Sequence, residues 1–259
     1  MTTAPLSSAQ ATSLAARTIT ATAPAIYVLG SAYYFAPATL ATGKELGLDG
    51  FRFYFLGRGG VLGDVEAPVV ASAFGYFEPG LLATMWSSAR QKADPRETAR
   101  LHLACAHRYG RDTFAGIGDL DLFCQAAEAV VAAVDPAGLA LFAGYAAEPL
   151  PDDLPARAMQ LVAVLRELRG SAHLLAVVAS GLSPRMAHYL RRPADFALFG
   201  WPDDDVPVVT DADRDAHTAA EELTTRLLLP AYATLDSTGA DALVAGIERM
   251  EAIRALGQP

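Results

Sequence analysis

Residues 158–178 read AMQLVAVLRELRGSAHLLAVV, and their apolar side chains follow a helical period. These side chains recur at intervals of three and four, at Ala158, Leu161, Val162, Leu165 and Leu168. Because an α-helix has about 3.6 residues per turn, this spacing places them on one side of a helix. Apolar residues continue beyond Gly170. The stretch therefore predicts one long or kinked helix.

The same period extends along most of the chain. It is clear from Leu120 to Val134, short helices fit the first half, and two more helices are expected at about 212–228 and 238–256, the first ending near Pro230. The segment 202–215 differs, because aspartates flank a β-branched run at 206–210. We therefore predict a mostly α protein, a helical bundle with one short β-hairpin confined to about residues 203–212.

Composition sets the class of protein and weighs against some partners. Of the 259 residues, 52% are hydrophobic and 19% are charged, which excludes a disordered chain, a collagen-like chain and a disulfide-rich scaffold. Acidic residues number 29 against 20 lysines and arginines, and the net charge is −9. Nucleic acids and anionic lipids attract positive charge. We therefore expect neither a nucleic-acid partner nor a membrane partner.

The cysteines and the longest uncharged run bear on the compartment. Cys105 and Cys124 lack the spacing of a disulfide framework or a metal site, so we expect a reducing, cytoplasmic location. The run 18–43 contains no charged residue, but Pro24 and Pro37 interrupt it. A membrane span needs about twenty continuous apolar residues. This run therefore favours a buried core helix.

Ionisable side chains lie at the end of the apolar face of the 158–178 helix. Arg166, Arg169 and His173 stand at positions i, i+3 and i+7, which share one helical stripe, and Glu167 is beside them. One interpretation is a ligand cavity in which His173, Glu167 and Arg169 are catalytic and Arg166 binds the substrate. The alternative is a lattice of ion pairs between helices, with His173 as a hydrogen-bonded core histidine. Both interpretations stay open.

Arg58 is a further candidate, because it ends an aromatic stripe next to two glycines. Its guanidinium is suited to bind a carboxylate of the substrate, with Tyr33, Tyr34 and Tyr76 as neighbours in a substrate-binding set. The alternative is a structural arginine that caps helix carbonyl groups. The sequence contains none of the common nucleotide, metal or nucleophile motifs. We expect no cofactor and no metal.

Four segments carry a family resemblance. They are YFAP at 34–37, YFLGRGGVLG at 54–63, VVASAFGYFEP at 69–79 and LRELRGSAH at 165–173. In this order, they resemble an actinobacterial family of helix-turn-helix proteins. The resemblance implies a helical N-terminal region, here 1–150, and a winged-helix-like C-terminal region, here 151–259. We expect the two regions to pack as one globular unit.

The sequence departs from this family where DNA would be read. Relatives carry a Trp- and Arg-containing helix in the recognition position, but only about 183–201 is available here, so we expect that helix to be shortened or lost. The segment 201–222 holds eight carboxylates and one arginine, and the carboxylates repel phosphates. Arg185, Arg191 and Arg192 form a basic cluster that we interpret as a solvated helix face. The C-terminal part is therefore expected to be a degenerate winged helix.

Two classes of function follow. The first is a cofactor-independent biosynthetic enzyme that acts on an apolar, polyketide-like small molecule by acid–base assisted cyclisation or dehydration, for example spiroketal or cyclic ether formation in secondary metabolism. The alternative is a small-molecule-sensing transcriptional regulator of winged-helix descent that binds DNA weakly or not at all. A binding protein without a reaction lies between them. The expected partner is an apolar small molecule, and a homodimer is a further possibility.

Overall fold

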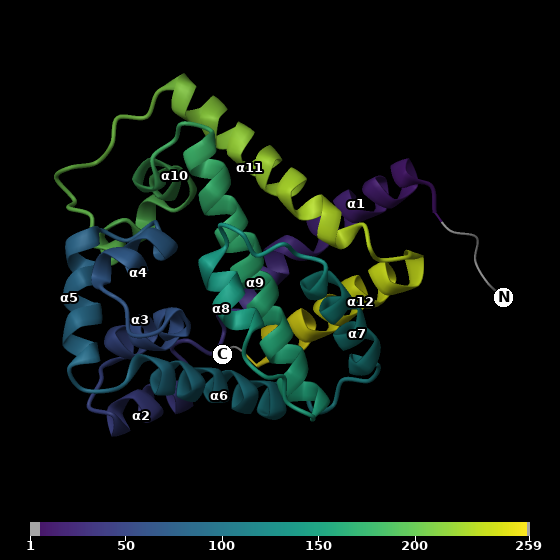
Figure 1. Ribbon diagram of the computed structural model, residues 1–259, viewed down its shortest axis with the longest axis horizontal. Coiled ribbons are helices and arrows are strands. Elements are labelled where there is room, and N and C mark those ends of the chain that lie inside the picture. Colours follow the sequence, from purple (N-terminus) through teal and green to yellow (C-terminus); the bar gives the residue numbers. More distant parts are fainter. Residues whose placement is uncertain (1–5, 258–259) are drawn as a thin grey trace.

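Helices make up the fold, as the computed structural model of residues 6–257 shows (Figure 1). Among these residues there are twelve α-helices, three short 3-10 turns and no strand, so the prediction of a mostly α protein is confirmed. The α-helices are α1 Ser8–Leu29, α2 Pro37–Glu45, α3 Gly50–Gly59, α4 Ala67–Phe74, α5 Pro79–Arg90, α6 Pro95–Phe114, α7 Leu120–Ala132, α8 Ala140–Ala146, α9 Leu154–Ala179, α10 Pro184–Arg191, α11 Asp211–Tyr232 and α12 Ser237–Leu256. The 3-10 turns are η1 Gly60–Leu62, η2 Pro193–Asp195 and η3 Ala197–Phe199.

Helix α9 is the central element (Figure 1). It contains the predicted long helix and continues without a break through Gly170. Asp153 caps its first turn by accepting a hydrogen bond from the Ala156 amide, and Pro155 occupies an early position where no backbone donor is needed. Helices α1, α6, α7, α8 and α11 all pack against α9. A helix surrounded in this way must be apolar on most sides, which explains its nearly continuous hydrophobic sequence.

The first and last helices pack together, because α1 lies against both α11 and α12. Helix α1 contains Pro24, and it is buried at Ile19 and Ile26. None of the helices in residues 6–257 combines the length and the apolar character required to cross a bilayer. The helix expected at about 212–228, ending near Pro230, is α11, which ends two residues beyond that proline, at Tyr232. Pro230 has no backbone N–H to donate within the helix. The last turn of α11 forms nevertheless, and Tyr232 is buried there.

The predicted β-hairpin at about 203–212 is absent. Residues 206–210 form no strand, and the Val208 side chain is 85% exposed. Pro207 removes a backbone donor from the run, and the described residues offer no neighbouring strand to complete a ladder. Thr210 instead begins α11, where its hydroxyl accepts from the Asp213 amide and the Asp213 carboxylate accepts from the Thr210 amide. The wing of the expected winged helix is therefore missing from this segment.

A short turn joins α9 to α10, and the two helices are called the α9–α10 unit. Four residues separate them, and Gly181 has a φ of +74°, a conformation that glycine adopts without a Cβ clash. Ser183 caps α10 by accepting from the Met186 amide. A small apolar cluster that includes Val177, Leu182 and Ala187 holds the turn against α11. Helix α10 ends after eight residues, at Arg191.

Candidate functional site

A cavity of about 130 Å³ lies beside the second half of α9. Its walls come from α1, α3, α4, α8, α9, α10 and η3. Apolar and aromatic side chains form much of the lining, among them Ile26, Phe74, Phe77, Leu141 and Phe199. Gly170 also lines it, and a Cβ placed on this residue would meet no heavy atom within 4 Å. A glycine in the middle of the central helix therefore leaves open space in the cavity.

Five arginines also line this cavity: Arg58 from α3, Arg166 and Arg169 from α9, Arg191 from α10, and Arg192, which follows α10. They gather at one place in a chain whose net charge is −9. Three carboxylates pair with them, namely Glu167, Glu221 and Asp195. The cavity therefore has a positive wall inside an acidic protein.

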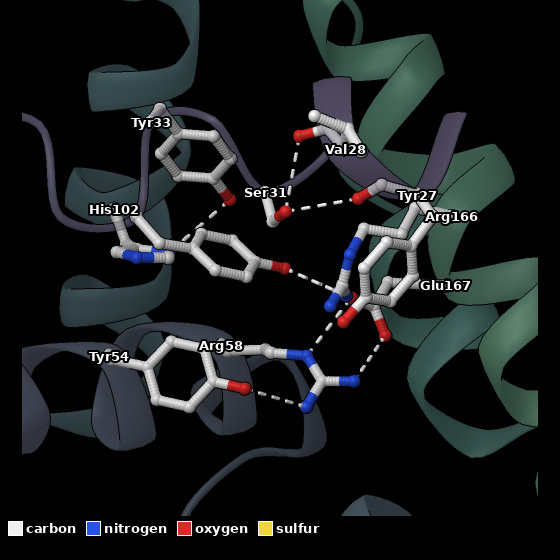
Figure 2. A network of polar contacts seen from close by, with 10 residues as sticks. Tyr27, Val28, Ser31, Tyr33, Tyr54, Arg58, His102, Arg166 and Glu167 are labelled. Atoms are coloured by element: carbon white, nitrogen blue, oxygen red, sulfur yellow. Dashed lines mark hydrogen bonds and ion pairs between the residues drawn. The ribbon is translucent and has the colours of Figure 1, made fainter. Parts of the chain in front are cut away.

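Arg58 and Glu167 form a buried ion pair at the inner end of the cavity. Figure 2 shows the Arg58 guanidinium facing the carboxylate, with Arg166 beside it. Arg58 Nε donates to Oε1 at 3.0 Å and Nη2 donates to Oε2 at 2.8 Å. Tyr54 accepts from Arg58 Nη1, and the Phe74 ring lies 4.3 Å from the guanidinium carbon. The pair has the two-pronged geometry that gives the strongest arginine–carboxylate contacts.

Arg166 shares this carboxylate. Its Nη1 donates to Glu167 Oε1 at 2.7 Å and to the Tyr34 hydroxyl at 3.0 Å. Burial alone would raise the pKa of Glu167, but the charges of Arg58 and Arg166 outweigh it and lower the pKa to about 2. Glu167 is therefore ionised at neutral pH. Gly30 makes room for Arg166, because a Cβ there would lie 2.8 Å from the arginine Cβ and Cδ.

A second group of charges surrounds Glu221 of α11. Arg169 donates to Oε2 at 2.8 Å and Arg191 donates to Oε1 at 3.2 Å. His173 Nε2 lies 3.8 Å from Oε1. Burial lowers the pKa of His173 to about 4. The Glu221 carboxylate opposes this shift, and the charge of Arg169 adds to it. The imidazole is therefore neutral at pH 7.

Thr224 fixes the orientation of this imidazole. Its hydroxyl donates to the Ala220 carbonyl at 2.7 Å, so the oxygen accepts a hydrogen bond from His173 Nδ1 at 3.0 Å. With the proton on Nδ1, the lone pair of the neutral ring is on Nε2. His173 can accept a proton there.

The structure brings together five of the eight predicted site residues. Arg58, Arg166, Arg169, His173 and Tyr76 all line the cavity. The sequence placed Glu167 beside Arg169 and His173, but its carboxylate instead pairs with Arg58 and Arg166, and Glu221 takes the position expected of it.

The two remaining tyrosines lie behind the cavity wall. Tyr34 donates to Glu167 at 3.3 Å and supports the ion pair. Tyr33 is fully buried, its hydroxyl is 3.4 Å from Nδ1 of His102, and burial raises its pKa. The tyrosine bonded to Arg58 is thus Tyr54, while Tyr34 contacts Arg166 and Glu167, and Tyr33 packs against Tyr34 without lining the cavity.

Sequence reasoning missed the contribution of α10. His188, Arg191 and Arg192 line the cavity, although the two arginines were interpreted as a solvated helix face. His188 and Arg191 stand at i and i+3 on one face of α10, and Arg192 follows at the C-terminal cap. That signal was present in the sequence, but its direction depends on how α10 packs against α9.

Unpartnered polar atoms concentrate at this cavity. In the part of the chain that the structure describes, six buried side-chain N or O atoms lack a hydrogen-bond partner. Three of the six belong to lining residues: the Tyr76 hydroxyl, Arg166 Nε and His188 Nε2. Buried polar groups without partners are rare and costly in native proteins. Within residues 6–257, no group of three His, Cys, Asp or Glu side chains is arranged to hold a metal ion.

Comparison with known proteins yields one match. A family model described as a helix-turn-helix family matches residues 16–205, which include the α9–α10 unit and the cavity lining. Neither the curated proteins nor the solved structures contain a significant match to this chain.

Proposed function

Although the chain belongs to this helix-turn-helix family, we propose that its α9–α10 unit encloses a small-molecule binding site and does not read DNA. The orientation of α10 carries this proposal. In DNA-binding members of the motif class, the second helix presents side chains outward to the base edges of the major groove. Here Ala187 and His188 of α10 are buried, and the His188 ring stacks on Phe199 with centroids 3.9 Å apart.

The basic side chains of α10 are likewise engaged with the protein. Arg191 pairs with Glu221. Arg185 pairs with Asp205 at 2.8 Å and lies over the Trp201 ring. The acidic segment 201–222 comes after η2 and η3, and its carboxylates repel phosphates. These contacts leave the helix a poor reader of DNA and make it one wall of the cavity.

The cavity has the composition of a small-molecule site, since apolar and aromatic walls surround a few polar groups. The Tyr76 hydroxyl, Arg166 Nε and His188 Nε2 have no hydrogen-bond partner in the protein, so a ligand group that reaches them would satisfy them. An engineered apolar cavity of about 150 Å³ in another protein admits benzene, and this cavity of about 130 Å³ is similar in size. A ring-sized apolar group therefore fits it.

Gly170 allows a direct test. Gly170→Leu directs a side chain into open space in the cavity, and Gly170→Ala is the matched control. Both changes replace glycine in a helix interior, where it costs about 1 kcal/mol relative to alanine, so we expect melting temperatures equal to or above that of the wild type. Calorimetry with 3-phenylpropanol and 3-phenylpropionate should show binding to the wild type that Gly170→Leu abolishes. Unchanged binding in a folded Gly170→Leu protein would show that the ligand does not bind in this cavity.

Acid–base chemistry at His173 is a second candidate function, favoured by the neutral imidazole on the cavity wall. A proton accepted at Nε2 gives an imidazolium 3.8 Å from the Glu221 carboxylate, which stabilises the charge. Glu167 serves in this scheme to hold Arg58 and Arg166, because it is ionised and paired. Cyclisation or dehydration of a polyketide-like chain, as expected from the sequence, is the corresponding reaction class.

This second candidate is tested by incubating hydroxylated polyketide-like ketones with the protein and following loss of water by mass spectrometry. His173→Gln should abolish product formation while leaving calorimetric binding intact. Product formation at equal rates with the wild type, with His173→Gln and without protein would exclude the enzyme.

A further inference from the structure

We infer that the ligand of this cavity carries an anionic oxygen group, a carboxylate or a phosphate, bound by Arg166, Arg191 and Arg192 around Tyr27. This inference rests on the proposed cavity function and adds the chemical class of the ligand. It is carried by the position of these guanidinium groups, the local charge balance and the donors that lack an acceptor.

Three guanidinium groups surround one tyrosine ring. The guanidinium carbons of Arg166, Arg191 and Arg192 lie 5.4, 5.4 and 4.7 Å from the centroid of Tyr27, which itself lines the cavity. They come from α9, from α10 and from the residue after α10. Like charges repel when they gather, so such a cluster is stabilised by an anion.

The carboxylates of the protein do not balance the cluster. Glu167 is shared between Arg58 and Arg166, and Glu221 is shared between Arg169 and Arg191. Only Asp195, paired with Arg192 at 3.2 Å, has a single arginine partner. Five arginines thus face three carboxylates, and two positive charges remain.

The unpartnered atoms point to the same chemistry. Arg166 Nε–H can only donate a hydrogen bond. The Tyr76 hydroxyl keeps its proton because burial raises the pKa of the group. Both are buried donors without acceptors, and an anionic ligand oxygen is an acceptor that satisfies them.

The arrangement also orients the ligand. Arg191 and Arg192 are on the solvent side, with side chains 39% and 38% exposed, whereas Phe74 and Leu141 are buried at 2% each. The apolar body therefore enters first and the anionic group remains near the arginines. The predicted ligand is a ring-sized or short-chain apolar acid or phosphate ester.

A matched series of ligands tests the charge. Calorimetry compares 3-phenylpropanol, 3-phenylpropionate and 3-phenylpropyl phosphate, which share one apolar body. At least one of the two anions should bind tenfold or more tightly than the alcohol, since a charged hydrogen-bonded contact contributes about 1.5–3 kcal/mol. The preferred anion distinguishes a carboxylate site from a phosphate site. Added salt should weaken binding of the anions and leave the alcohol unchanged.

A matched pair of variants tests the residues. Arg192→Gln should reduce anion affinity about tenfold and leave alcohol affinity unchanged, and Arg226→Gln, at an exposed position of α11 away from the cavity, should change neither. Both sites are partly or fully exposed, so both variants should fold, which melting curves check.

The possible failures are separable. If alcohol and anions bind equally and Gly170→Leu abolishes all three, the anion inference is wrong and the cavity function stands. If none of the three binds the wild-type protein, both proposals are rejected. If the anions bind better but Arg192→Gln has no effect, the arginine assignment is overturned.

Discussion

Arg58 and Glu167 are 109 residues apart in the chain, yet two hydrogen bonds of 3.0 and 2.8 Å join their side chains inside the protein. The pair connects α3 to the central helix α9 directly behind the cavity. Glu167 is 1% exposed and Arg58 is 8% exposed. A charge at either position is stable only while its partner is present, because water cannot replace it.

Removal of one member of this pair should therefore destabilise the protein strongly. We expect Glu167→Gln to lower the free energy of unfolding by about 3–5 kcal/mol, since two buried arginines lose their shared counter-charge. Arg249→Gln is the control, because its pair with Asp119 is exposed and contributes at most about 1 kcal/mol. Urea denaturation measures both. Equal losses in the two variants would contradict the assigned role of the buried pair.

The free energy of unfolding should fall as the pH is lowered through two ranges. His173 has a pKa lowered from 6.5 to about 4, so below pH 6.5 the unfolded chain binds a proton that the folded protein does not, and stability declines until about pH 4. Glu167 has a pKa lowered from 4.5 to about 2, so its contribution is present above pH 4.5 and is lost as pH falls toward 2. Chemical denaturation at a series of pH values measures both declines.

The variant His173→Gln measures the share of His173 in the upper range, to which His102 also contributes because burial lowers its pKa to about 3. A pKa difference of this size corresponds to about 3 kcal/mol, so the variant should flatten the decline between pH 6.5 and 4 by up to about that amount. The decline between pH 4.5 and 2 should persist. An unchanged upper range would show that His173 is protonated normally in the folded protein.

Close packing at Gly60 gives a prediction about the fold alone. A Cβ at this position would lie 1.9 Å from the Pro95 carbonyl oxygen, a backbone atom that cannot move aside. We expect Gly60→Ala to destabilise the protein by at least about 2 kcal/mol. The control is Gly116→Ala, where a Cβ meets nothing within 4 Å. Thermal melts compare them, and a stable Gly60→Ala protein would contradict this packing of η1 against α6.

We also predict no sequence-specific DNA binding at physiological salt, about 0.15 M. Ala187 and His188 of α10 are buried, Arg185 and Arg191 of this helix are paired with carboxylates of the protein, and the segment 201–222 is acidic. Selection from random duplexes followed by gel-shift titration measures this. A nanomolar, salt-sensitive complex with a defined sequence would reverse the proposal in favour of a DNA-binding regulator.

How far the site was predictable depends on where each partner comes from. Arg166, Arg169 and His173 share one face of α9 because of helical geometry alone, and Arg58 was identified by its place at the end of an aromatic stripe. The partners were not predictable, since Glu167 pairs with a residue of α3 and Glu221 arrives from α11. Sequence adjacency on α9 said nothing about which carboxylate faces which arginine.

The sequence by itself determined the helices. The apolar side chains at 158–178 recur with a helical period, so a helix is the conformation that buries them together, and this helix is α9. Only the tertiary structure decided the fate of segments whose local pattern was ambiguous. Residues 206–210 favour a strand locally but have no strand to pair with, and Arg191 and Arg192 line the cavity only because α10 packs against α9. Helix formation depends on neighbours in the chain, whereas strand pairing, ion pairing and cavity lining depend on groups that only folding brings together.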